Sequence, residues 1–245
     1  MSRFGLVVGF IVGIALCSKG QESLAPSHKL IRPLQPILEV LRSANVSGSL
    51  ILSAHCGENR AIPFSFPVFR HFPSLQILGS SERSPLETLR GMFAADKAIK
   101  VTKDRDGTIR IIEDGVQANL LGTRISHIAF ESTRLPSQNA AFYASAALLR
   151  TILQAPEVVT FMETHHIEFP FNGEGGSFDI GAGTDSEPPV RVTLDNLTLA
   201  NALDKLTQMF PGMWLYEECS QPGKNGSVVG IWFFDLQGPG PFVQE

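Results

Sequence analysis

The stretch VRVTLDNLTLANALDKL, residues 190–206, changes its hydrophobic period in the middle. Val190, Val192 and Leu194 alternate with polar residues, which predicts a half-buried strand. Thr198 is then a good N-cap for a helix, because its hydroxyl can accept a hydrogen bond from the backbone. The expected apolar side of that helix consists of Leu199, Ala202, Leu203, Leu206 and Phe210. The stretch therefore predicts a strand that leads directly into a helix.

Two more strands are expected after this helix, which Pro211-Gly212 should end. The first is MWLYEEC, residues 213–219, and the second is SVVGIWFFDL, residues 227–236. Turn-forming residues separate them. The predicted order of elements is strand, helix, strand, strand, or βαββ.

Residues 74–114 predict the same order a second time. SLQIL is the expected first strand, and Ser84-Pro85 with Glu87 forms a capping box with a proline start for the helix. Two alternating strands follow around Asp106-Gly107, a strong hairpin signal.

The rest of the chain is predicted from periodicity and composition. An apolar stripe predicts a helix over residues 33–45, and a buried strand is expected within 47–56. Ala- and Leu-rich residues 138–154 predict a helix, and Pro156 starts another. The expected fold class is α+β, with one or two small βαββ units and a helical middle segment. The expected domains are a signal peptide (1–20), a linker (21–32), an N-terminal region (33–170), a Gly/Pro-rich linker (171–189), a C-terminal module (190–236) and a flexible tail (237–245).

The first twenty residues have the pattern of a secretory signal peptide. Arg3 precedes an apolar run from Phe4 to Cys17, and small residues stand before a cut at Gln21. An uncleaved N-terminal membrane anchor is the alternative, although the run is short for a membrane span. We therefore expect a periplasmic or secreted protein whose mature chain does not span a membrane. The net charge of −4 and the lack of a basic run argue against a nucleic-acid partner.

Export changes the expectation for the cysteines. Cys56 and Cys219 remain after signal cleavage, and a pair of cysteines in an oxidising compartment predicts a disulfide. Two buried free thiols are the alternative.

Residues 189–236 resemble the short N-terminal domain shared by secretins and TonB-dependent transducers. The positions that match are Val192, Leu194, Asn196, Leu199, Ala202, Leu203, Leu206, Trp214 and Tyr216. Residues 74–114 resemble a degenerate second copy, in which Arg90 stands where the family has a helical leucine; two unrelated units are the alternative. The resemblance implies a noncatalytic docking module that contacts bacterial envelope proteins through a sheet edge or a helix face.

Candidate binding residues lie on the last two expected strands: Trp214, Tyr216, Trp232, Phe233 and Phe234. Three rings stand in a row in IWFFDL, so some must face away from the helix. These rings form either a binding patch for a protein partner or packing against the middle helices.

Glu163, His165 and His166 are the densest group of potential metal ligands or bases. Adjacent histidines on a helix point in different directions, and no H-E-x-x-H pattern is present. A polar helix end is the simpler interpretation, and no catalytic residue, metal or cofactor is assigned. We expect a noncatalytic docking or assembly protein of the bacterial cell envelope. The alternative is a periplasmic hydrolase, with or without zinc, that uses these three side chains.

Overall fold

The computed structural model describes a large part of the 245-residue chain. The described residues are 26–53, 76, 83–131, 144–169, 190–220 and 226–236, with side chains from residue 34 onward. The expected signal peptide, the linker 171–189 and the tail 237–245 lie outside them. Among the described residues, no helix has both the length and the apolar character that a membrane span requires.

A mixed six-stranded sheet forms the centre of the molecule, in the order β2-β3-β1-β7-β8-β5. β1 is parallel to both β3 and β7, whereas the pairs β2–β3 and β7–β8 are antiparallel hairpins. Two residues of β5 add a parallel edge to β8. The strands are β1 (Gly48–Ser53), β2 (Ile99–Lys103), β3 (Ile109–Glu113), β5 (Ile167–Glu168), β7 (Gly212–Ser220) and β8 (Ser227–Asp235).

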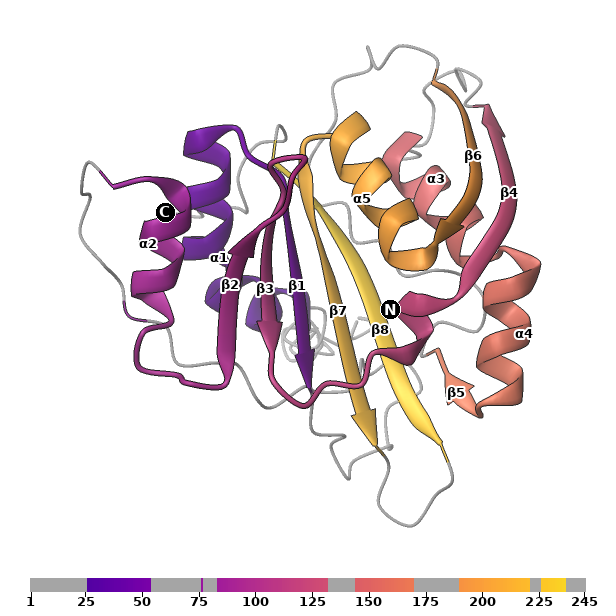
Figure 1. The fold of residues 1–245 in the computed structure, drawn as a ribbon, viewed down its shortest axis with the longest axis horizontal. Helices are drawn as coiled ribbons and strands as arrows, with labels where there is room; N and C mark the ends of the chain where they lie inside the picture. Colours follow the sequence, from indigo (N-terminus) through magenta and orange to yellow (C-terminus); the bar gives the residue numbers. More distant parts are fainter. Residues whose placement is uncertain are drawn as a thin grey trace, which may run out of the picture.

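Helices cover both faces of this sheet (Figure 1). From left to right in the view lie α1 with α2, the sheet, α5 with α3, and a separate two-stranded ribbon of β4 and β6. The protein is therefore an α/β structure. The helices are α1 (Pro26–Ala44), α2 (Pro85–Met92), α3 (Ala144–Leu153), α4 (Pro156–Thr164) and α5 (Leu199–Met209), with the short η1 (Asn119–Gly122); the ribbon strands are β4 (Arg124–Glu131) and β6 (Arg191–Thr198).

Two hydrophobic cores result, one on each face. The first lies between the sheet and α1 with α2, and the second lies between the sheet and α3, α4 and α5. β1 contributes Leu50 and Leu52 to the first core and Ile51 to the second. A strand that is apolar on both faces suits the centre of a sheet with helices on both sides.

Most predicted elements are present. The capping box at Ser84 and Glu87 is confirmed, as is the hairpin around Asp106-Gly107. Thr198 caps α5, because its Oγ1 accepts the Asn201 N–H at 3.2 Å. α1 begins at Pro26, inside the segment expected to be a linker, since proline is well tolerated in a first helical turn.

For residues 190–236, the βαββ prediction is confirmed for the order of elements and is wrong for their pairing. β6 pairs with β4 in the ribbon, while β7 and β8 belong to the six-stranded sheet. The strand expected at 74–78 lies outside the described residues except Gln76, which is not in a strand. Among the described residues, β1 is the sheet strand that comes before α2 in the chain. Because β1 pairs with both β3 and β7, the two expected units share one sheet.

Candidate functional site

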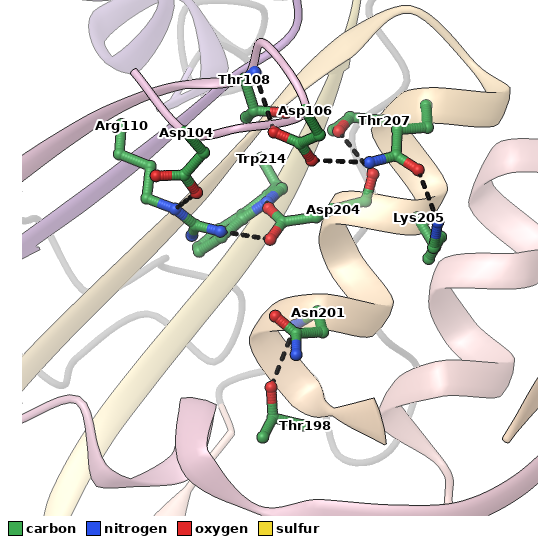
Figure 2. A network of polar contacts seen from close by, with 11 residues as sticks. Asp104, Asp106, Thr108, Arg110, Thr198, Asn201, Asp204, Lys205, Thr207 and Trp214 are labelled. Atoms are coloured by element: carbon green, nitrogen blue, oxygen red, sulfur yellow. Dashed lines mark hydrogen bonds and ion pairs between the residues drawn. The ribbon is translucent and has the colours of Figure 1, made fainter. Parts of the chain in front are cut away.

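A polar cluster connects the β2–β3 hairpin to α5 (Figure 2). Arg110 of β3 forms ion pairs with Asp104, which follows β2, and with Asp204 of α5. Asp204 also accepts a hydrogen bond from Trp214 Nε1 at 2.9 Å. Trp214 belongs to the second core, so Asp204 connects this core to the polar residues around Arg110. The cluster therefore ties three separate elements of the second sheet face together.

Further hydrogen bonds join α5 to the N-terminal half of the chain. Gln208 Nε2 donates to Asp106 Oδ2 at 2.7 Å, and Ser47 Oγ donates to the Thr207 carbonyl at 2.8 Å. In each pair one residue belongs to the N-terminal half of the chain and the other to α5. We call the group of Asp104, Asp106, Arg110, Asp204, Gln208 and Trp214 the clasp.

Burial and pairing act against each other in the clasp. Burial raises the pKa of Asp204, and the bonds from Trp214 and Arg110 offset only part of this effect. Burial also acts to lower the pKa of Arg110, but its bonds to Asp104 and Asp204 outweigh burial and the pKa is raised. Arg110 is thus held by two carboxylates. An open depression of about 470 Å³ lies over the cluster, lined in part by Lys103, Arg105 and Asn201.

The chemistry of the clasp fits a structural role. Its arginine is already shared by two acids, so it offers no unneutralised charge to an anionic substrate. Sequence reasoning missed it, because Asp204 is one of several polar residues in the sequence of α5 and its partner Arg110 is 94 positions away.

The aromatic residues expected as a binding patch are core side chains. Their exposed fractions are 0–2%. Trp232 and Phe234 lie in the first core, and Phe233 in the second, so alternation does turn them to opposite faces. The rings are buried on both faces of the sheet because α1 and α2 cover the face for which the sequence predicted no covering helix. Trp214 and Tyr216 also lie in the second core.

The group of Glu163, His165 and His166 is at the exposed end of α4. His165 is the C-cap residue, and its ring lies 4.1 Å from the ring of Phe161 between centroids. Within the described residues, these side chains do not gather into a group that could hold a metal ion. The geometry therefore matches a polar helix end.

Cys219 is 1% exposed in the first core and is disulfide-bonded. The described residues do not include both cysteines of any bridge, because Cys56 lies outside them. The Cys56–Cys219 bridge stays a prediction.

The edge strand β2 is protected against pairing with another chain. Arg90 of α2 donates from Nε to the Val101 carbonyl at 3.0 Å, so this edge acceptor is already used. Lys100 and Lys103 are exposed on the same strand, and lysines discourage strand addition. Arg90 therefore has a local role at this edge of the sheet.

The β4–β6 ribbon is different. It pairs from Arg124 opposite Thr198 to Glu131 opposite Arg191, and the described residues add no third strand to it. Within these residues, no hydrogen bond outside the ribbon engages the backbone of 191–195. Each strand of a two-stranded ribbon leaves part of its N–H and C=O groups directed away from its partner. Among the described residues, the ribbon therefore has strand edges that no other strand pairs with.

The two faces of the ribbon also differ. Ile125, Ile128 and Leu194 are buried against the helices, whereas the outer face is exposed. Across the outer face His127 Nδ1 lies 2.6 Å from Asp195 Oδ1, and Arg191 Nη2 lies 2.6 Å from Glu131 Oε1. These pairs hold the two strands in register and cost no burial of charge.

The ribbon bends at Asn196. This residue has a φ of 52°, and the register has no aligned pair between Ser126 and Asn196. Asparagine adopts the left-handed region more readily than most residues. The irregularity lets both Ile125 and Ile128 turn toward the core, although strict alternation would separate them.

Comparison with known proteins finds no matching family model, no matching curated protein and no matching solved structure.

Proposed function

We propose that this chain is a noncatalytic docking or assembly protein of the bacterial cell envelope, periplasmic or secreted. It docks an envelope protein by strand addition to the β4–β6 ribbon. The observation that carries the proposal is the open backbone edge of the ribbon, described above for residues 191–195. In strand addition, the free N–H and C=O groups of such an edge bind an extended segment of the partner.

The contrast with β2 supports the ribbon as the docking element. Both edges belong to exposed strands, but β2 has a capped carbonyl and two exposed lysines. Residues 127–131 and 191–195 contain neither lysine nor proline. The charged side chains of these ribbon residues are engaged in pairs across the ribbon. Among the described residues, this edge lacks the lysines and the capped carbonyl that protect β2, which favours it as the pairing surface.

Photo-cross-linking tests the proposal. A benzophenone amino acid is placed at Thr193 of β6, or at Ala129 of β4, in the full chain produced in bacterial cells. The matched control is the same replacement at Thr102, an exposed threonine on the protected strand β2. We expect ultraviolet-dependent adducts with another envelope protein from a ribbon position and not from Thr102. No adduct with another protein from either ribbon position, or equal adducts from Thr102, would contradict the proposal.

A further inference from the structure

We infer that the free edge of β6 binds the same edge of a second copy of this chain. Two ribbons would then join into one antiparallel four-stranded sheet around a two-fold axis at Thr193. The inference rests on the proposed function only in taking the ribbon as the docking element, since here the occupant is the chain itself.

The sequence of β6 is self-complementary at this edge. With Thr193 opposite its own copy, Arg191 stands opposite Asp195 of the second chain, and Asp195 stands opposite Arg191. Val192 stands opposite Leu194 in the same way. Opposite charges directly across two strands stabilise an antiparallel pair. A two-fold interface requires this property, because a contact between one residue of the first chain and another residue of the second chain is repeated with the two chains exchanged.

The existing ion pairs extend this pattern over four strands. Glu131 and Arg191 already form one pair across the outer face, and His127 and Asp195 form another. In the joined sheet one row would read Glu131, Arg191, then Asp195 and His127 of the second copy. Acidic and basic side chains alternate along the row, and the symmetry repeats it in reverse order.

The inner face of the ribbon continues in the same way. Phe130 and Val192 are half-buried and face each other across the ribbon, and Ile128 and Leu194 are buried opposite each other. Joining at β6 places Val192 beside Leu194 of the second copy. The apolar row then continues through the interface, and the remaining exposed surface of Val192 is covered.

The β4 edge is less suitable. Ser126 of β4 donates its backbone N–H to Glu157 Oε1 at 2.9 Å, and α4 packs against this strand. Apart from β4, β6 packs mainly against α5, which follows it directly in the chain.

Sedimentation equilibrium of the purified full chain tests the inference. We expect a reversible dimer at about 100 μM, since small strand-paired interfaces are weak. Thr193→Lys sets two lysines opposite each other and should weaken the dimer roughly tenfold or more. Thr102→Lys, at an exposed threonine on β2, should leave the dimer unchanged. A monomeric wild type overturns the inference, and so does a dimer broken by Ala129→Lys and not by Thr193→Lys.

A charge-complementation experiment checks the register. Arg191→Asp gives two acids along the edge, and Asp195→Arg gives two arginines. Each variant alone should be monomeric, and an equimolar mixture should form a heterodimer, because acids then meet arginines at both ends. Circular dichroism of each variant checks that it folds. Folded variants that dimerise alone, or a mixture of folded variants that stays monomeric, would exclude this register.

These measurements contain no other protein. A monomer that still yields adducts with another envelope protein from ribbon positions would overturn the self-pairing and keep the proposed function. A dimer that yields no such adducts would keep the self-pairing and overturn the proposed function.

Discussion

Asp204 and Glu217 are both buried acids beside the central sheet, on opposite faces and with opposite surroundings. Asp204 is 5% exposed and is bonded to Arg110 and Trp214. Glu217 on β7 is fully buried, and neither of its carboxylate oxygens has a hydrogen-bond partner among the described residues. By alternation it lies on the face of Leu215 and Cys219, toward the first core.

The difference shows what a partner does for a buried acid. A paired acid fixes the elements that hold its partners, whereas an unpaired one mainly adds a desolvation cost. Burial alone raises the pKa of Glu217 to about 8, so it stays largely protonated at neutral pH. The second face is thus stabilised by a polar network, and the first depends on its apolar packing.

Removing the paired acid should have the largest effect. Asp204→Ala leaves the Trp214 N–H buried without an acceptor and removes one of two acids from Arg110. We expect a loss of about 3–5 kcal/mol in the free energy of unfolding, as for other broken buried pairs. Urea denaturation measures it. The control is Asp195→Ala, an exposed ion-paired acid, with a loss of at most about 1 kcal/mol. Equal losses would show that the clasp does not stabilise the fold.

Removing the unpaired acid should have an effect of the opposite sign that grows as the pH rises. The folded pKa of Glu217 exceeds its unfolded value, so the folded state binds more protons and stability falls as pH rises toward about 8. Glu217→Gln removes this titration. The stability of the wild type relative to the variant should therefore fall between roughly pH 5 and 8, by up to about 1.4 kcal/mol per unit. Parallel pH profiles of the two proteins would refute an unpaired buried acid.

Disturbing the packing around Glu217 should have the next largest effect on stability. Gly230 stands opposite Glu217 in the register, and a Cβ there would lie 1.9 Å from the ring of Trp232. Gly230→Ala should therefore displace this ring and cost about 1–3 kcal/mol, with a change in tryptophan fluorescence. Gly122→Ala is the control, since a Cβ at Gly122 meets nothing within 4 Å. An unchanged spectrum and stability for Gly230→Ala would show that the ring does not lie over Gly230.

The rim of the clasp should have the smallest effect. Gln208 is exposed and bonds Asp106 and Lys205. Gln208→Ala should cost less than about 1 kcal/mol in urea denaturation, because exposed polar pairs exchange readily with water. A loss of stability as large as that of Asp204→Ala would show that the exposed rim of the clasp stabilises the fold as much as its buried centre does.

Local chemistry explains what the sequence predicted well. Ser84, Glu87 and Thr198 act on backbone groups within three residues, and the Asp106-Gly107 turn joins adjacent strands. Such signals can be recognised without knowledge of the rest of the fold. The buried stripe of α5 is predictable for the same reason.

Long-range pairing explains what the sequence could not predict. Nothing in residues 191–198 specifies that β4, rather than β7, is the partner of β6. The aromatic residues were ambiguous because their exposure depends on α1, which is far away in the sequence. Asp204 and Glu217 were not recognised because burial of an acid follows from the elements around it.

The double pairing of β1 also has a consequence for folding kinetics. Gly48 is aligned with Ile109 on one side and with Met213 on the other, so the centre of the sheet closes a loop of more than one hundred and sixty residues. Closing so long a loop costs entropy before any contact compensates for it. The sheet cannot be completed until the C-terminal hairpin has left the ribosome. We therefore expect this chain to fold slowly, so that its unfolded form persists for longer than that of a protein whose strands pair only with near neighbours in the sequence.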